Sequence, residues 1–394
     1  MRGLWGVLLL ISAGRFLAFV ARMDIVPFYP ELMARYGTTY TGAGALFTAF
    51  FVGYVLSMIP SGLAADRWQS DLQIALGFLI MGLCNIAVAL TTSYTLALGA
   101  RVVQGIGVAM VFMGVLKLVA VSFTRGNRGK AVGVMEVATG LGLLTALTIF
   151  PVLSRWIDYR WLMLSLPVMC VAVVVAMIAL RRSAPSGEAA RARPGPPLRS
   201  LLGWDLLCIT LTTFLGLFCY NGLLGWLPTH LSLLGYSKAG AGAVNGVILA
   251  ASMAGVYPAG SLSDRIGRRV PVVNVGSLIM IAGFLGLLVV KGGAAMYALA
   301  ALIGLGMSMA VTPMTILTTE MFGPERAGVI SAITVAVAQV GTGLTGVVFG
   351  WVLDRTGSFT AVWLLATLLS ALRLPTAAGI GEMRRRALPA PASE

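Results

Sequence analysis

Twelve apolar stretches constrain what this chain can fold into more than any other feature of its sequence. A helix that crosses a bilayer needs about 20 mostly apolar residues, and each stretch reaches that length. The stretches occupy residues 4–30, 41–64, 72–92, 95–121, 130–153, 160–181, 204–229, 239–262, 270–290, 294–319, 327–350 and 358–381. The sequence therefore predicts an all-α membrane protein with twelve transmembrane helices.

One polar segment divides this series in its middle. Residues 182–203 are rich in arginine, proline, serine and glycine and have almost no apolar side chains, which is typical of a linker. We therefore expect an N-terminal six-helix bundle over residues 1–181, a linker over 182–203, and a C-terminal six-helix bundle with a short tail over 204–394.

The composition argues for lipid as the solvent of most of the chain. Only 11% of the residues are charged, whereas soluble domains carry about a quarter. The net charge of +14 is also a feature of nucleic-acid-binding proteins. Here the basic residues stand in short loops between apolar stretches, so no nucleic-acid partner is expected. The four cysteines lie inside apolar stretches without metal-ligand spacing, and we expect neither a metal ion nor a cofactor.

Lysine and arginine are distributed unequally between the two sides of the predicted bundles. With a cytoplasmic N-terminus, the cytoplasmic loops, linker and tails hold 17 of these 28 residues, the opposite loops hold 6, and 5 lie inside the stretches. Because basic residues accumulate on the cytoplasmic side, we expect a multi-pass protein of the cell (inner) membrane with both termini and the linker in the cytoplasm.

A short motif occurs once in each half of the chain. Gly62–Arg67 reads GLAADR and Gly260–Arg269 reads GSLSDRIGRR, and the two aspartates are 198 residues apart (264 − 66). Each copy follows an apolar stretch and has a proline two positions before its glycine. A second set repeats at an offset of 199 residues: Gly105, Gly107, Phe123 and Gly129 recur as Gly304, Gly306, Phe322 and Gly328. Two agreeing offsets indicate two homologous membrane halves.

The pattern G-x-x-x-D-R-x-G-R-R between two apolar helices resembles the cytoplasmic loop signature of the major facilitator superfamily. The second copy matches in full, whereas Gln69 and Ser70 replace the glycine and arginine of the first. The resemblance implies two pseudo-symmetric six-helix bundles, a monomer, and a role for Asp66 and Asp264 as latches. A carboxylate accepts hydrogen bonds from the free N–H groups of a helix N-terminus, here the starts of the eleventh and fifth stretches. The expected cytoplasmic gate comprises Gly62, Asp66, Arg67, Gly260, Asp264, Arg265, Arg268 and Arg269. The alternative is that the Asp-Arg pair only makes a tight turn polar and has no latch role.

Three charged residues stand within the first apolar stretch, where ionisable groups mark functional sites by default. Arg15 and Arg22 are seven residues apart, so they share one helical face and lie about 10 Å apart along the axis. We expect both to point into a wet central cavity as substrate-binding residues. Asp24 projects from nearly the opposite face to Arg22, and it either pairs with a neighbouring helix or titrates.

This stretch is similar to the first-helix signature of the anion:cation symporter branch, D-R-x-N-I-S-x-x-x-P-x-L-M. Arg22, Ile25, Pro30, Leu32 and Met33 match, while Ala21 and Asp24 replace the acid and the amide of that signature. The segment Trp226-Leu-Pro-Thr-His230-Leu resembles W-L-P-T-Y-L of the same branch, with histidine at the tyrosine. The resemblance implies that Arg22 binds the substrate anion.

Four further charges lie within apolar stretches. Arg101-Val-Val-Gln-Gly resembles the fourth-helix R-x-x-Q-G motif of the superfamily, which implies a role in coupling and helix packing. Lys117 and Glu136 have similar depths, so Glu136 either forms a structural ion pair with Lys117 or carries a proton. Arg373 is expected to reach the cytoplasmic interface. Five basic and two acidic side chains make the interior positive, which selects anions.

Polar side chains elsewhere in the stretches are candidates to contact the rest of a substrate. Each is also able to serve as a hydrogen bond between helices. They are Tyr54, Tyr220, Asn221, Asn245, Tyr257, Thr312 and Gln339.

These observations predict a secondary transporter that moves a small organic anion, a carboxylate, by proton symport with alternating access. Asp24 or Glu136 would carry the proton, which would offset the charge of the anion. One alternative is a proton-coupled exporter of drugs or lipophilic cations. Such exporters of this superfamily carry a glycine-rich motif in the fifth helix, and Ala146 and Phe150 do not fit the spacing of that motif. Another is a sensor without transport on the same fold. No nucleophile–base pair, metal cluster or phosphate loop is present in the sequence, so an enzyme is not expected.

Overall fold

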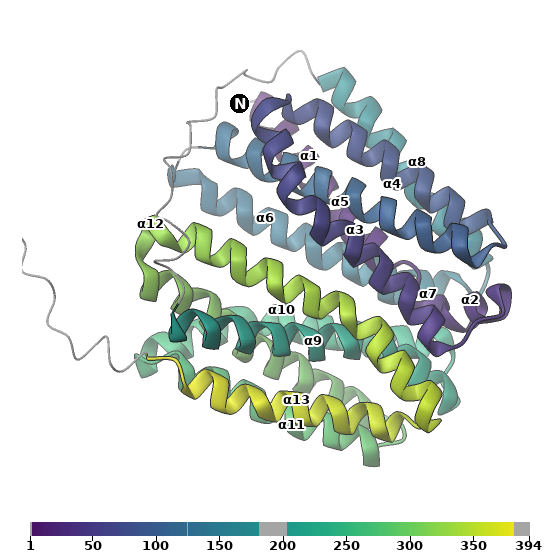
Figure 1. The fold of residues 1–394 in the computed structure, drawn as a ribbon, viewed down its shortest axis with the longest axis vertical. Helices are drawn as coiled ribbons and strands as arrows, with labels where there is room; N and C mark the ends of the chain where they lie inside the picture. Colours follow the sequence, from purple (N-terminus) through teal and green to yellow (C-terminus); the bar gives the residue numbers. More distant parts are fainter. Residues whose placement is uncertain (1, 124, 181–202, 382–394) are drawn as a thin grey trace, which may run out of the picture. The chain divides into compact units, whose positions relative to one another are not determined.

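The computed structural model describes residues 2–123, 125–180 and 203–381. Its elements are α1 (Arg2–Met23), η1 (Val26–Phe28), α2 (Tyr29–Tyr36), α3 (Tyr40–Arg67), α4 (Ser70–Leu90), α5 (Tyr94–Ser122), α6 (Arg125–Leu144), η2 (Thr145–Ile149), α7 (Phe150–Leu153), α8 (Tyr159–Leu180), α9 (Trp204–Leu233), α10 (Lys238–Ile266), α11 (Val270–Val289), α12 (Ala294–Thr356) and α13 (Phe359–Ala378). Figure 1 shows most of these helices as long coiled ribbons, with α2 and α7 as short ones. Twelve helical segments are long and apolar enough to cross a membrane, which confirms the all-α fold and the number of predicted spans.

Short polar residues start several of these helices where the sequence predicts a boundary. Thr39 accepts a hydrogen bond from Gly42 N at the start of α3, and Ser93 accepts one from Leu96 N at the start of α5. Such N-caps satisfy backbone donors that the first turn leaves without partners. Gly37 ends α2 with a φ of 58°, a left-handed conformation that glycine adopts without strain.

The first predicted span is longer than expected and is interrupted. It was expected over residues 4–30, but α1 ends at Met23, a 3₁₀ turn follows, and α2 continues to Tyr36. Pro27 and Pro30 open the two later elements. Proline has no backbone N–H, so it ends the hydrogen-bond ladder of a helix and is accepted in the first turn of the next.

No non-helical residue separates the tenth and eleventh spans, which together make up α12, whereas the sequence predicts a loop between them. A straight helix of 63 residues would be about 95 Å long, about three times the hydrocarbon thickness. Instead α12 contains two candidate spans, Ala294–Phe322 and Ile330–Thr356. Met314 from the first span and Ser331 from the second line the same pocket, so α12 folds back on itself between them.

Gly105 and Gly304, one pair of the repeated glycines, make equivalent contacts in the two halves. A Cβ on Gly105 would lie 2.0 Å from Phe50 O, and a Cβ on Gly304 would lie 2.4 Å from Ile248 O. The two acceptors are themselves 198 residues apart (248 − 50). Small residues allow membrane helices to approach closely, so α3 packs against α5 as α10 packs against the first span of α12. This repetition is the structural form of the pseudo-symmetry that the sequence predicts.

The described residues form two compact units. Among the described residues, the first unit comprises residues 2–123 and 125–180 with Leu224–Gly246 and Gly343–Gly357, and the second comprises residues 203–223, Val247–Thr342 and residues 358–381. One end of α9, of α10 and of α12 therefore packs with the N-terminal half of the sequence. The predicted linker lies outside the described residues except for Gly203, so the predicted domain boundaries stay a prediction.

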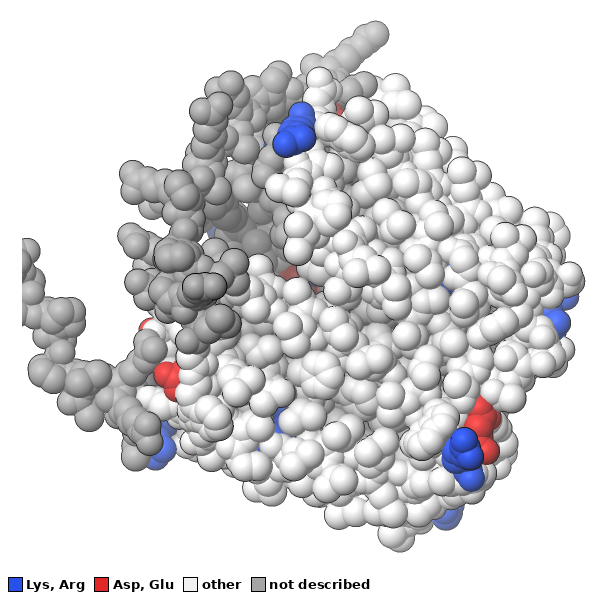
Figure 2. Space-filling model, viewed as in Figure 1, with Lys and Arg blue, Asp and Glu red and all other residues white. Residues whose placement is uncertain are grey.

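The surface has the character expected of a protein in lipid. Figure 2 shows a face with few charged atoms, most of which lie near its margins. Large apolar side chains such as Leu56, Ile59 and Leu83 are exposed. Exposed apolar surface on this scale is unusual for a soluble monomer, and the fold is that of a multi-pass membrane protein.

Candidate functional site

A buried ion pair joins the end of α1 to α5. Arg101 Nη1 lies 3.2 Å from Asp24 Oδ1, and both side chains are fully buried. Asn85 of α4 donates to Asp24 Oδ2 at 2.5 Å, and Gln104 Oε1 accepts from Arg101 at 2.7 Å. Asp24 thus pairs with a neighbouring helix, one of the two alternatives from the sequence, and its role as a proton carrier stays a prediction.

Arg101 also holds the interrupted first span in place. Its Nη1 donates to Ala21 O at 3.1 Å and its Nε donates to Leu46 O at 3.2 Å. Ala21 lies in the last turn of α1, where backbone carbonyls have no partner within the helix. The guanidinium therefore ties α1 and α3 to α5, in keeping with the packing role that the R-x-x-Q-G resemblance implies.

Arg15 forms a second ion pair, to α6. Its Nη2 lies 2.8 Å from Glu136 Oε1, and its Nε donates to Thr139 Oγ1 at 3.1 Å. The arginine is buried, whereas the side chain of Glu136 is 57% exposed. The Lys117–Glu136 pair considered from the sequence is not what the structure shows.

Lys117 of α5 instead binds the carbonyl groups at the C-terminal end of α3. Its Nζ donates to Ala65 O and, at 3.1 Å, to Trp68 O. Carbonyls at a helix C-terminus attract cations because the helix dipole is negative there. In the first motif copy, Gln69 and Ser70 stand where the motif has glycine and arginine. Lys117 supplies a positive charge at that same helix end.

Arg22 lines a pocket formed within the first unit. Its guanidinium carbon lies 4.7 Å from the ring centroid of Phe51 and 5.3 Å from that of Phe19. The pocket is narrow, with a cavity volume of about 10 Å³, which is room for about one water molecule. Its lining residues are Ala18, Phe19, Arg22, Phe50, Phe51, Tyr54, Val108 and Phe112. Of the predicted substrate contacts, the structure thus brings Arg22 and Tyr54 together, while Arg15 lies over the ring of Phe112 at 4.8 Å.

The sequence did not identify the phenylalanines of this pocket. Phe19 stands three residues before Arg22, and Phe50, Phe51 and Tyr54 follow one another at helical spacing on α3. In an apolar stretch such residues look the same whether they face lipid, the protein interior or a ligand. The one sequence feature that could have placed these phenylalanines in the pocket is their helical spacing from Arg22 and from Tyr54.

Asn245 lies in the first unit and donates to Leu224 O at 3.2 Å. The remaining predicted substrate contacts lie in the second unit, and two of them take part in hydrogen bonds between helices. Tyr220 Oη and Ser252 Oγ share a hydrogen bond of 3.4 Å. Asn221 donates to Thr342 Oγ1 at 3.3 Å. Gln339 is buried, Thr312 is half-buried and Tyr257 is exposed. Their role toward a substrate stays a prediction.

Arg373 is not at an interface, contrary to the expectation from the sequence. Its side chain is 1% exposed. Nε donates to Thr212 O at 3.1 Å and Nη2 to Ala310 O at 3.4 Å. Gly216 makes room for the guanidinium, since a Cβ there would lie 2.8 Å from Arg373 Cζ. The arginine therefore joins α9, α12 and α13 of the second unit.

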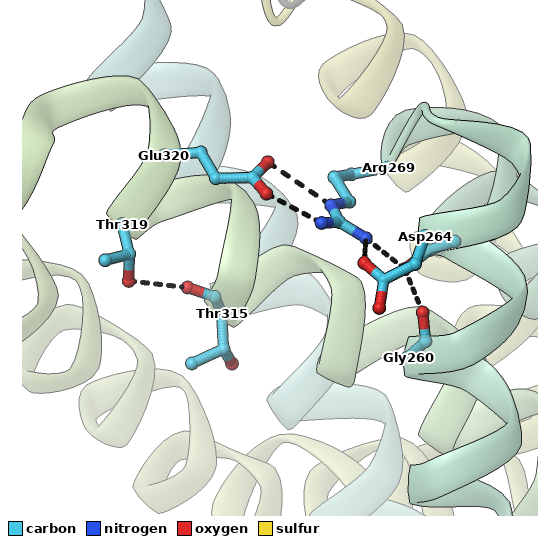
Figure 3. A network of polar contacts seen from close by, with 7 residues as sticks. Gly260, Asp264, Arg269, Thr315, Thr319 and Glu320 are labelled. Atoms are coloured by element: carbon cyan, nitrogen blue, oxygen red, sulfur yellow. Dashed lines mark hydrogen bonds and ion pairs between the residues drawn. The ribbon is translucent and has the colours of Figure 1, made fainter.

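The second copy of the repeated motif forms a polar network (Figure 3). Arg269 donates to Asp264 Oδ1 at 2.5 Å, to Ser263 Oγ at 2.7 Å, and to both carboxylate oxygens of Glu320 at 2.6 and 3.2 Å. Hydrogen bonding to Glu320, and then to Asp264, raises the pKa of Arg269 above its usual range. Sequence reasoning missed Glu320, which lies 51 residues after Arg269.

The first residues of each motif copy belong to helices that run past the predicted ends of their stretches at residues 64 and 262. α3 continues to Arg67 and α10 to Ile266, so the loops proper are only two or three residues long. Gly267 has a φ of 67° and ends α10. Arg67, Arg265 and Arg268 are exposed. The side chain of Asp66 lies outside the described residues, and the expected latch contacts to the fifth and eleventh spans stay a prediction.

A cluster of contacts at the opposite end of the first unit joins segments from both halves of the sequence. Asp354 of α12 accepts hydrogen bonds from Tyr40 N at 3.1 Å, from Thr41 N at 2.8 Å and from Thr41 Oγ1 at 2.5 Å, at the start of α3. Lys238 of α10 pairs with Glu31 of α2. The Trp226 ring of α9 lies 5.1 Å from that of Tyr29. We call Asp354, Tyr40, Thr41, Lys238 and Glu31 the outer latch, after the orientation and the function proposed below.

Comparisons with known proteins agree with this architecture. A chloramphenicol resistance protein of Streptomyces lividans is 25% identical over 262 residues, 65% of each chain. The 3-(3-hydroxy-phenyl)propionate transporter of Escherichia coli (strain K12) is 24% identical over 335 residues, which cover 77% of this chain and 79% of that one. The solved structure of a D-xylose-proton symporter superposes with a TM-score of 0.76 at 17% identity, covering 98% of this chain and 99% of that chain. Residues 11–346 match the Major Facilitator Superfamily, and the chain belongs to that family of membrane transporters.

Proposed function

We propose that this protein is a secondary transporter of a small organic anion, a carboxylate, of the anion:cation symporter type. The observation that carries the proposal is Arg22, a nearly buried cation that lines a pocket inside the bundle. A charged group at membrane depth is costly unless it serves a function. The similarity to a transporter of 3-(3-hydroxy-phenyl)propionate, itself a carboxylate, supports the same substrate class.

Arg22 would bind the carboxylate directly. A guanidinium presents N–H groups in a planar fork that matches the two oxygens of a carboxylate. In a pocket with little water this attraction is stronger than in bulk solvent. Arg15 would assist from the neighbouring turns, since it contacts Phe19 as Arg22 does.

We propose proton symport with Glu136 as the carrier. Glu136 is the more accessible of the two candidate acids, and its partner is Arg15. Protonation of Glu136 would remove the negative charge that holds Arg15 and leave that arginine available to an anion in the adjacent pocket. Asp24 is the alternative carrier, although its pairing with Arg101 is fully buried.

Alternating access gives the outer latch a function. With both termini in the cytoplasm, as the distribution of lysine and arginine indicates, the end that carries Asp354 and Lys238 faces outward. Contacts between the two sequence halves there must break when the carrier opens outward. The network of Asp264, Arg269 and Glu320 lies at the cytoplasmic end. The protein is proposed to act as a monomer in the lipid bilayer.

Uptake into proteoliposomes tests this proposal. Wild-type protein should accumulate a carboxylate when the pH outside is lowered, and Arg22→Gln should abolish that uptake, whereas Arg160→Gln, an exposed arginine of α8, should not. Glu136→Gln should abolish accumulation driven by a pH gradient but retain exchange of internal for external substrate, because exchange needs no net proton movement. Uptake that is unchanged in Arg22→Gln contradicts the proposal. Gradient-driven uptake that survives in Glu136→Gln but not in Asp24→Asn assigns the proton to Asp24.

A second function is favoured by the similarity to a chloramphenicol resistance protein: proton-coupled export of drugs or lipophilic cations. The same vesicles distinguish it. If lipophilic compounds but no carboxylate are transported, and Arg22→Gln transports them as wild type does, the exporter replaces the symporter.

A further inference from the structure

We propose that the second unit contains a binding site for a small monovalent anion beside Arg373, separate from the pocket at Arg22. A cavity of about 70 Å³ lies there, and its described lining residues all belong to α9, α12 and α13 within the second unit. The inference goes beyond the proposed function, because this site would bind its ion whether or not Arg22 binds an organic anion.

Arg373 is a buried cation whose contacts among the described residues are all to neutral groups. Its side chain is 1% exposed. It donates to Thr212 O at 3.1 Å and to Ala310 O at 3.4 Å, and its Nη1 lies 3.8 Å from Met280 Sδ. A guanidinium has five N–H donors and a thioether is a weak acceptor, so these three contacts leave at least two donors without a partner among the described residues. A buried charge in this state is costly, which favours an anion beside it.

Other buried arginines of the chain have a carboxylate partner. Three of them form ion pairs with aspartate or glutamate, and they are Arg15, Arg101 and Arg269. The described lining of the cavity at Arg373 contains neither aspartate nor glutamate. A bound anion would supply the negative charge that the chain itself supplies at the other three arginines.

The internal repeat indicates that the fold does not need an arginine at this position. At the offset of 198 residues, Arg373 corresponds to Val175 (373 − 175). Gly216, which makes room for the guanidinium, corresponds to Ala18 at the same offset (216 − 18). The equivalent helices of the first half, α1 and α8, thus carry apolar side chains at both positions. A costly ionisable group that the repeated scaffold does without marks a functional site.

Hydroxyl groups line much of the cavity. Five of its ten described lining residues are serine or threonine, namely Thr213, Thr315, Thr318, Ser331 and Thr334. Thr213 donates to Ile209 O at 2.8 Å and Thr318 donates to Met314 O at 2.9 Å, each within its own helix. A hydroxyl hydrogen rotates to suit its acceptor, and hydrogen bonds to an ionised acceptor are stronger than those to a neutral one. These hydroxyl groups can therefore turn toward an anion in the cavity.

The volume and the charge of the cavity limit its ligand. A water molecule needs about 10–15 Å³ of such volume, so about 70 Å³ is room for an ion of a few heavy atoms. One arginine offsets one negative charge, and a divalent anion would bury a second charge without a partner. Chloride, nitrate and formate meet both conditions, whereas gluconate is too large and sulfate carries too much charge.

Chloride NMR on the detergent-purified protein tests the site. Chloride that exchanges between water and a protein site has a broadened line, and the excess width falls when another ion displaces it. For the wild type in sodium chloride, we expect excess broadening that nitrate and formate reduce at constant ionic strength, and that gluconate and sulfate do not. Replacing gluconate by chloride should also raise the melting temperature, by roughly 2 °C for each tenfold increase in concentration above Kd.

Substitution of the arginine locates the ion. Arg373→Met removes the charge from the cavity and should abolish both the excess broadening and the stabilisation by chloride. Arg160→Met, the same change at an exposed arginine of α8, should alter neither. Arg22→Gln should also leave both effects unchanged, which separates this site from the pocket in the first unit.

A milder pair of variants decides the question if Arg373→Met does not fold. Thr318→Val combined with Thr334→Val removes two hydroxyl groups from the lining and keeps the shape of the side chains. Chloride affinity should fall about tenfold or more, since hydrogen bonds to a charged group are lost. Thr367→Val, which removes a hydroxyl of α13 outside the lining, should change the affinity by less than about twofold.

Three results would overturn the inference. The first is a wild type that shows neither broadening nor stabilisation by chloride relative to gluconate. The second is unchanged chloride binding in Arg373→Met or in the double threonine variant, or its loss in Arg22→Gln. The third is displacement of chloride by benzoate more effectively than by formate, which would assign the cavity to a larger organic ligand. None of these results decides carboxylate uptake, which the proteoliposome experiment tests separately.

Discussion

Replacing Asp354 by asparagine should weaken the outer latch, at the end of the first unit that we propose to face outward. The carboxylate accepts three hydrogen bonds from Tyr40 and Thr41 at distances of 2.5 to 3.1 Å. Those donors are the first two residues of α3, where the helix dipole also favours a negative charge. Losing a capping side chain costs about 0.5–2 kcal/mol, and losing a charge at a helix terminus costs about 0.3–1 kcal/mol. Asparagine keeps one acceptor oxygen, so the closed outer latch should lose about 1–2 kcal/mol.

This loss predicts about a 5- to 30-fold larger open fraction at the outer end. A cysteine in place of Thr48 reports it, because Thr48 donates to Gly343 O at 2.6 Å and so lies where α3 meets α12. In a background without the four native cysteines, the rate of labelling by a membrane-impermeant maleimide from outside should rise by that factor in Asp354→Asn.

Asp158→Asn is the matched control. Asp158 accepts a hydrogen bond from Arg160 N at 2.8 Å at the start of α8, so it caps a helix without joining the two halves of the sequence. The labelling rate of Thr48→Cys should not change in that variant. Equal rates in Asp354→Asn and in the parent, with the fold retained, would show that Asp354 does not hold the outer end closed.

Three further variants test the packing and the networks. Arg101→Met should lower the free energy of unfolding in detergent by about 3–5 kcal/mol, because it leaves Asp24 buried without its cation; a loss no larger than that of an exposed arginine variant contradicts the role of this pair. Gly105→Ala should lower the melting temperature, since its Cβ would lie 2.0 Å from Phe50 O, whereas Gly62→Ala, with nothing within 4 Å of its Cβ, should not. Glu320→Gln should make a cysteine in place of Ser263 more accessible to a maleimide, because Arg269 loses the charge of one of its two carboxylate partners. Unchanged labelling would argue that the charge of Asp264 is sufficient to hold Arg269.

The fold was predictable because its signals are local and repeated. The length of each apolar stretch sets a membrane span, and the glycines at offsets of 198 and 199 residues mark where helices touch. Gly105 and Gly304 meet the backbone of α3 and α10 at equivalent positions. The interruption at Pro27 and the continuity of α12 were not predicted, since proline placement and helix continuity across a turn depend on tertiary packing.

The partners of the charged residues were less predictable. The depth of Glu136 in its span is readable from the sequence, but the helix that faces it is not, and its partner is Arg15 instead of Lys117. Arg373 is near the end of its stretch, which suggested an interface, yet Gly216 opens a space for it between helices. Such pairings depend on which helices are neighbours and on how each helix is rotated about its own axis. Neither can be predicted from a single sequence.

The repeat nevertheless extends further than the motifs that revealed it. Thr39 and Ser237, the N-caps of α3 and α10, are 198 residues apart (237 − 39), and Arg155 and Asp354 are 199 apart (354 − 155). Asp354 contacts the start of α3, and Arg155 Nη2 contacts Ser237 Oγ at 3.5 Å. The geometry is thus repeated but its chemistry is not, because a carboxylate is attracted to a helix N-terminus and a guanidinium is repelled by it. Asp354 must therefore contribute most of the stability of this pair of contacts, and Arg155→Gln should change the outer labelling rate far less than Asp354→Asn does.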